Sequence, residues 1–168
     1  MPINIFIFRL ACALLAGIVI GAQRELRQHQ AGLTTNSLVA VGACIFILIS
    51  ESVIMTAMAN GGPVNNDNLR VLSQVVTGIG FLGAGVIMKN GLTIHGLSSA
   101  ATIWCSAGIG CLCGYGMWKE ALIATAVIIL INWGLKGIEI YFKKKKIFTF
   151  LGKMSRKFIN CINLHRKL

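Results

Sequence analysis

The hydrophobic residues of this chain form long runs that are separated by short polar stretches. A membrane-spanning helix needs about 20 mainly apolar residues, and five runs meet that length: residues 3–22, 37–58, 71–88, 98–117 and 121–142. The polar connections between them are residues 23–36, 59–70, 89–97 and 118–120. Because helices satisfy their own backbone hydrogen bonds in lipid, the pattern predicts an all-α integral membrane protein with five transmembrane helices.

The composition agrees with this assignment, and the distribution of charge indicates a basic C-terminal tail. Hydrophobic residues make up 55% of the chain and the mean hydropathy is +0.74, which is unusual for a soluble domain. Nine of the sixteen Lys and Arg residues follow residue 142, with no acidic residue among them. Apolar residues recur there at helical spacing. We therefore expect a transmembrane domain at 1–142 and a basic amphipathic cytoplasmic tail at 143–168, lying on the bilayer or docking on an acidic partner.

The positive charges also predict an orientation. In a five-span arrangement the connections 23–36 and 89–97 and the tail lie on one side, and they carry Arg24, Arg27, Lys89 and the lysines at 143–146. The positive-inside rule makes that side cytoplasmic and places the N-terminus outside. The same concentration of charge argues against nucleic-acid binding, which spreads basic residues over a soluble fold.

Arg9 and Glu51 are charged residues inside predicted spans. Each lies 14 residues from the cytoplasmic end of its span, or about 21 Å at the helical rise. Antiparallel neighbours would place the two side chains level, and charges within a membrane are usually paired or functional. We predict an intramembrane ion pair; the alternative is that each side chain extends separately to the outer headgroups.

Glycines mark the run at residues 74–85 (QVVTGIGFLGAG). Glycine on a transmembrane helix lets another backbone approach closely, so Gly78, Gly80, Gly83 and Gly85 are predicted to pack helices. The pairs Gly17/Gly21, Gly80/Ala84 and Gly110/Gly114 are predicted to do the same, within one chain or between copies in a homo-oligomer. The run also spells G-x-G-x-x-G, but it lacks the preceding strand and the later acidic residue of a dinucleotide site, so we expect no cofactor there.

A polar group is predicted at the cytoplasmic ends of the helices. It includes Arg24, Thr35, Asn36, Ser98 and Ser99, and the predicted helix starts at Ser37 and Ser98 would direct free N–H groups to the same face. Such a face suits an anionic group, either a lipid phosphate or an acidic partner. Ordinary helix capping and positive-inside charge explain the same residues.

Two similar stretches, residues 32–35 (GLTT) and 96–99 (GLSS), lie 64 residues apart. They are compatible with a parallel repeat of helix pairs 1–2 and 3–4 about an axis along the membrane normal. Similar capping requirements explain them equally well.

The sequence contains no constellation typical of an enzyme or a metal site. There are five acidic residues in the whole chain, no Ser-His-Asp set, and no zinc-ligand spacing. We therefore expect no catalytic residues and no metal, and a non-enzymatic role.

Three stretches resemble the signatures of the MgtC/SapB family. They are residues 21–27 with 31–39 (GAQRELR and AGLTTNSLV), residues 74–87 (QVVTGIGFLGAGVI) and residues 96–110 (GLSSAATIWCSAGIG). The resemblance covers roughly residues 5–140. It implies a five-span bacterial inner-membrane protein associated with growth in low magnesium and with virulence, and with restraint of ATP synthase. Family residues of interest map to Asn36 and Cys105.

The chain departs from the family pattern at two positions. Gln23 stands where the family usually has glutamate, and Thr34 where it has arginine, which puts any role of those charges in doubt. Many members carry a soluble C-terminal domain, whereas here we expect the basic tail after residue 142, so the resemblance does not extend to regulation through that domain. Two roles remain open: a regulator that contacts a membrane complex, and a small ion transporter or channel that uses Arg9 and Glu51.

Overall fold

The structure, a computed structural model, describes residues 1–60 and 68–134. The basic tail predicted at 143–168 and the end of the fifth span lie outside these residues. The chain divides into two compact units, Met1–Ile129 and Leu130–Leu168, and the described part of the second unit, residues 130–134, is helical.

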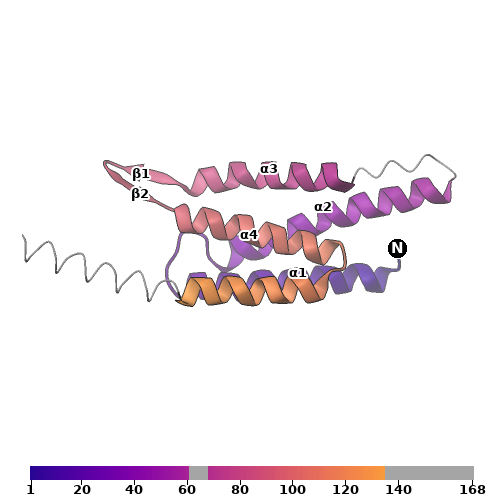
Figure 1. Cartoon of the computed structure of the whole chain (residues 1–168), viewed down its shortest axis with the longest axis horizontal. Helices are drawn as coiled ribbons and strands as arrows, with labels where there is room; N and C mark the ends of the chain where they lie inside the picture. The colour runs from indigo at the N-terminus through magenta and orange to yellow at the C-terminus, as the bar shows by residue number, and fades with distance from the viewer. Residues whose placement is uncertain (61–67, 135–168) are drawn as a thin grey trace, which may run out of the picture. The chain divides into compact units, whose positions relative to one another are not determined.

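The described part is almost entirely helical (Figure 1). The helices are α1 (Ile3–Glu25), α2 (Leu33–Ala59), α3 (Asn68–Val86) and α4 (Leu97–Gly114). Residues 118–134 are helical too. The four labelled helices are each long and apolar enough to cross a membrane, which confirms the prediction of an all-α membrane protein.

One connection differs from the expected loop. Residues 89–97 were predicted only as a connection between spans, but β1 (Met88–Asn90) and β2 (Thr93–His95) pair antiparallel, with Asn90 opposite Thr93. Gly91 has a φ of +59° and is the first of the two turn residues, the position at which a type II′ hairpin turn favours glycine. The hairpin was not predicted because this turn signal was overlooked.

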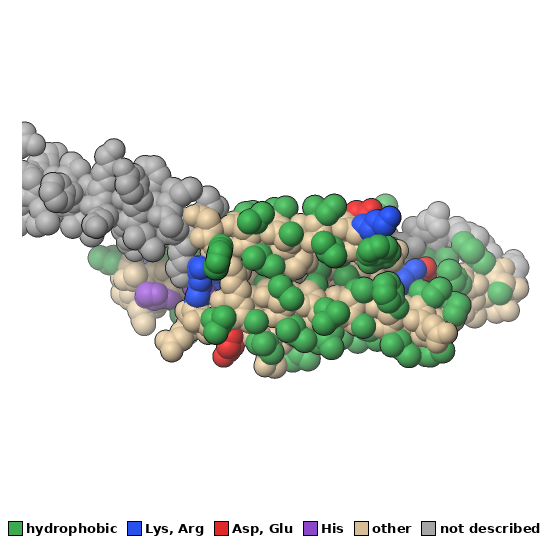
Figure 2. Space-filling view, turned by 90° about the horizontal axis from the view of Figure 1, so that it is seen from below, with side chains coloured by type: hydrophobic (Ala, Val, Ile, Leu, Met, Phe, Trp, Pro, Cys, Tyr) green, Lys and Arg blue, Asp and Glu red, His purple; other side chains and the backbone are tan. Residues whose placement is uncertain are grey.

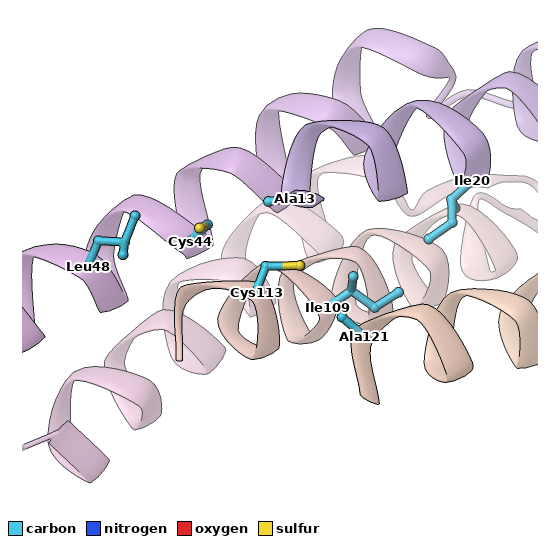
Figure 3. Close-up of a cluster of buried hydrophobic side chains, with 7 residues drawn as sticks. All are labelled: Ala13, Ile20, Cys44, Leu48, Ile109, Cys113 and Ala121. Atoms are coloured by element: carbon cyan, nitrogen blue, oxygen red, sulfur yellow. The ribbon is translucent and has the colours of Figure 1, made fainter. Parts of the chain in front are cut away.

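Two apolar clusters hold the bundle of unit Met1–Ile129 together. Figure 3 shows the first, in which side chains of α1, α2, α4 and the start of the fifth helix meet: Ala13, Ile20, Cys44, Leu48, Ile109, Cys113 and Ala121. The second joins α2 and α4 and is extended by partly buried residues of α3: Ala31, Val39, Ala43, Ile47, Ile103, Ala107 and Cys111. The buried thiols thus serve as small hydrophobic side chains.

Hydrophobic side chains also cover the outside. Figure 2 shows them spread along the visible face, with charged side chains near its two ends. Leu15, Phe46 and Leu122 are among the large apolar residues that are more than half exposed. This distribution is expected when lipid surrounds the helices, since lipid tails are as apolar as the side chains that face them.

Close helix contacts occur at two of the three predicted glycine pairs. A Cβ on Gly17 would lie 2.7 Å from the Cα of Ser37, and one on Gly21 would lie 2.5 Å from the Cα of Leu33. On α4, a Cβ on Gly110 would lie 2.1 Å from the carbonyl oxygen of Ala40, and Gly114 is similarly close to Ile47. Gly17/Gly21 and Gly110/Gly114 are therefore confirmed as helix-packing pairs.

The glycines of α3 behave differently from the prediction. A Cβ on Gly78, Gly80 or Gly85 would meet no atom within 4 Å, and one on Gly83 would make an ordinary 3.6 Å contact with Ala100. Within the described residues Gly78, Gly80 and Gly85 therefore bring no helix close, whereas Gly83 is buried and faces Ala100 of α4 at an ordinary packing distance. α3 packs mainly on α4 and contacts α2 only sparsely. Packing between chains remains a prediction.

Candidate functional site

The ion pair predicted from sequence is present. Arg9 Nη1 on α1 donates to Glu51 Oε2 on α2 and also to the carbonyl oxygen of Gly114 at the end of α4, at 2.8 Å. The side chains of Arg9 and Glu51 are 16% and 23% exposed. The turn after α4 closes on the guanidinium at Gly116, which has a φ of +77° and where a Cβ would lie 2.9 Å from Arg9 Nη2. Three helices therefore meet at this charge pair.

A second polar centre lies where α1 ends and α4 begins. Arg24 is only 3% exposed, and its Nη1 and Nη2 donate to the hydroxyl oxygens of Ser98 at 3.0 Å and Ser99 at 2.8 Å. Its Nε is buried and has no hydrogen-bond partner in the described part of the chain. The structure thus brings together three of the residues predicted for this face.

Asn36 is fully buried and forms a separate hydrogen-bonded group with Ser106 of α4. Its Nδ2 donates to the carbonyl oxygens of Gly32 at 2.7 Å and Ala31 at 3.3 Å, while its Oδ1 accepts from Ser106 Oγ at 2.9 Å. One amide therefore ties the α1–α2 connection to α2 and α4. There are thus two hydrogen-bonded groups, Arg24 with Ser98 and Ser99 and Asn36 with Ser106. They are together called the polar cluster below.

The start of α2 was predicted wrongly. The helix begins at Leu33, and Ser37, predicted as the helix start, donates its hydroxyl to the Leu33 carbonyl oxygen from within the helix. The Leu33 N–H donates to Glu25 Oε2 at 3.0 Å. Glu25 therefore fills the position of an external anion, since a carboxylate at a helix N-terminus is stabilising. A Cβ on Gly32 would lie 1.7 Å from this oxygen, so Gly32 makes room for the cap.

The proposed repeat has limited support. Gly32 and Gly96 are both N-cap residues, of α2 and α4. Their φ angles are −97° and +88°, so the two turns differ in backbone conformation. The similarity of residues 32–35 and 96–99 thus extends to their place before a helix and not to the shape of the turn.

Two predicted site residues lie outside the polar cluster. Thr35 is half-buried in the first turn of α2. Cys105 is half-buried on α4 and lines a small apolar hollow of about 200 Å³ beside Leu72 and Trp104. Neither forms a hydrogen bond with the cluster in the part of the chain that is described.

The two positions that depart from the family pattern, Gln23 and Thr34, lie in different surroundings. Gln23 Nε2 donates to the Ile129 carbonyl oxygen at 3.4 Å, and its Oε1 is buried without a partner among the described atoms. Thr34 is exposed. Gln23 and Thr34 do not form a hydrogen bond with each other in this described part of the chain.

Removing the Asn36 amide is expected to lower the free energy of unfolding. Asn36→Ala removes the amide partner of the Ala31 carbonyl and of the Ser106 hydroxyl, and leaves the Gly32 carbonyl only the backbone N–H of residue 36. This should cost about 2–3 kcal/mol. Unfolding by SDS titration in detergent micelles measures the change. Thr35→Ala, next along the chain and only half-buried, should change the stability by less than about 0.5 kcal/mol. Equal losses in the two variants would contradict this role for Asn36.

Comparison with known proteins identifies the family. The family model described as MgtC family matches residues 10–141. Among curated proteins, the chain is 51% identical over 127 residues to Protein MgtC of Salmonella typhimurium, which covers 76% of this chain and 51% of that protein. It is 48% identical over 123 residues to Protein MgtC of Brucella abortus, covering 73% and 48%.

A third relative, Uncharacterized protein slr0014 of Synechocystis, is 41% identical over 143 residues, covering 84% of this chain and 56% of that protein. No solved structure matches. The chain spans about half the length of the curated relatives it matches. The family match includes α2–α4, most of α1, Glu51 and the polar cluster, and begins one residue after Arg9. The chain belongs to the MgtC family.

Proposed function

We propose that this chain is a regulatory protein of the bacterial inner membrane. It binds a membrane complex such as ATP synthase through its helices, and acts in adaptation to low magnesium and in virulence. Its N-terminus lies outside and its C-terminus lies in the cytoplasm, as positive-inside charge favours. Membership of the MgtC family supports the proposed role in regulation, and so does a feature of α3.

The supporting feature is the outer face of α3, defined by Thr77, Gly80, Phe81 and Ala84. These residues are three or four apart and so share one side of the helix, and all four are exposed, with Phe81 at 82%. A Cβ on Gly80 would meet nothing within 4 Å. Small residues on a lipid-facing helix permit the close approach of a second helix. This face belongs to the second family signature. Gly80 and Ala84 border an open hollow beside α4, and Gly80 has no close neighbour there.

The ion pair favours such a contact-based role over transport. Arg9 already donates to Glu51 and to the Gly114 carbonyl oxygen, so the two charges neutralise each other inside the bundle. An ion pathway generally needs polar groups that exchange partners with the ion. A pair held by three helices is better suited to fixing the bundle.

Capture of the partner tests the proposal. The full chain, carrying an affinity tag, is purified from bacterial membranes in mild detergent and the co-purified proteins are identified by mass spectrometry. We expect ATP synthase membrane subunits with the native sequence. Gly80→Leu should reduce their recovery about tenfold, because the added side chain separates the two helix surfaces and costs about 1.4 kcal/mol of binding.

The control keeps the same change on another open glycine. Gly108 on α4 also meets nothing within 4 Å, so Gly108→Leu should leave recovery unchanged. Equal recovery with Gly80→Leu and the native sequence would count against α3 as the contact surface, and absence of ATP synthase subunits would count against this partner. Ion flux in liposomes that Glu51→Gln abolishes would favour the transporter instead.

A further inference from the structure

A groove between α2 and α3 separates these two helices on the lipid-facing side of the bundle. It has a volume of about 640 Å³, which lies in the range of ordinary ligand sites. Its walls are apolar apart from one end, and they include Gly42 and Phe46 of α2 and Gly78 and Leu82 of α3. The two glycines widen it, since a Cβ on either would meet nothing within 4 Å.

The polar residues of the groove are confined to the first turns of α3. Arg70 and Gln74 line it and are both exposed; they are four residues apart and so share a face. α3 begins at Asn68, so Arg70 lies at the edge of the span. The groove therefore has a cationic, hydrogen-bonding end at the membrane surface and an apolar remainder within the membrane, which is the polarity of a phospholipid.

The dimensions agree with the same occupant. From Arg70 to Leu82 the groove extends about 18 Å along α3 at the helical rise. One leaflet contributes about 15 Å of hydrocarbon, half of the bilayer core. A helix of the same length with its side chains would occupy about 1,400–2,000 Å³, given a diameter of about 10–12 Å. That is more than twice the volume of the groove, whereas a single acyl chain is much narrower than a helix.

We propose that this groove binds one phospholipid of the leaflet in which α3 begins. An acyl chain lies between Gly42 and Gly78, and the phosphate and ester groups lie against Arg70 and Gln74. The lipid fills the gap that the sparse α2–α3 contact leaves, so it would fix α3 against the rest of the bundle. Because Arg70 is cationic, anionic phosphatidylglycerol is preferred over zwitterionic phosphatidylcholine.

Retained lipid tests the site. The full chain is reconstituted in vesicles of equal parts phosphatidylglycerol and phosphatidylcholine, extracted, and washed in detergent, and bound phospholipid is counted by native mass spectrometry and phosphorus assay. We expect about one retained molecule per chain, mostly phosphatidylglycerol. The groove-filling variant Gly42→Leu/Gly78→Leu should retain about fivefold less, and Arg70→Gln should abolish the preference for phosphatidylglycerol.

Gly85→Leu is the matched control, because Gly85 also meets nothing within 4 Å and does not line the groove. It should retain lipid as the native sequence does, and thermal unfolding should show that all variants are folded. Equal retention by the groove-filling variant and by Gly85→Leu would overturn the site. The site would also be overturned if the groove-filling variant kept its phospholipid but lost a dimer or a captured protein that the native sequence has.

Failure here is distinguishable from failure of the regulatory role. Partner capture responds to Gly80→Leu, on the outer face of α3, whereas lipid retention responds to Gly42→Leu/Gly78→Leu. Gly80→Leu should leave the retained phospholipid unchanged, because Gly80 does not line the groove.

Discussion

Replacing Arg9 by Leu should be among the most damaging single changes in the bundle. We expect the free energy of unfolding to fall by about 3 kcal/mol or more, because Glu51 loses its counter-ion while it remains largely buried. The same change also removes the hydrogen bond to the carbonyl oxygen of Gly114. SDS titration followed by circular dichroism measures the loss.

A double variant separates the effect of the unpaired Glu51 charge from the loss of the Arg9 side chain. In Arg9→Leu/Glu51→Gln the uncompensated carboxylate is gone, so about half or more of the lost stability should return. Arg9→Lys should fall between the native protein and Arg9→Leu, because an ammonium keeps the charge without the planar guanidinium that spans two acceptors. Equal stabilities of the single Leu variant and the double variant would show that the ion pair does not contribute.

Adding one methyl group at Gly110 should destabilise the protein by about 3 kcal/mol. The Cβ would lie 2.1 Å from the Ala40 carbonyl oxygen and 2.9 Å from its carbon. Both are backbone atoms, so α2 and α4 would have to move apart. Thermal and SDS unfolding of Gly110→Ala measure the effect.

Gly108→Ala, two residues away, is the control and should not destabilise the protein. A Cβ there meets no atom within 4 Å, and alanine is favoured over glycine within a helix by up to about 1 kcal/mol. We therefore expect no loss and a small gain in stability. A similar response at both positions would contradict the close α2–α4 contact at Gly110.

The sequence was most informative where the membrane makes an unpaired charge energetically costly. Arg9 and Glu51 could be paired before the structure was known, because an isolated charge in a bilayer is costly and both lie equally far from one end of their spans. Gly17/Gly21 and Gly110/Gly114 could be identified as contact sites from their four-residue spacing. The third pair, Gly80/Ala84, has the same spacing but makes no such contact, since spacing identifies a suitable face and not the neighbour that occupies it.

The polar cluster shows the same limit. Arg24, Asn36, Ser98 and Ser99 were grouped correctly at the helix ends, but Ser106, from a later turn of α4, was missed. A hydroxyl inside an apolar run usually bonds within its own helix, so nothing local indicates that Ser106 reaches Asn36 70 positions away. The role of Glu25 as the cap of α2 was also missed, because it depends on how the connection between α1 and α2 folds back.

The sequence by itself determined that helices cross a membrane and which charges must be neutralised inside it, because length, hydropathy and the cost of charge in lipid are properties of the residues. Only the tertiary structure decided which helices touch. Contact depends on the relative placement of whole helices, which left α3 apart from α2 and opened a groove where a run of glycines had predicted close packing.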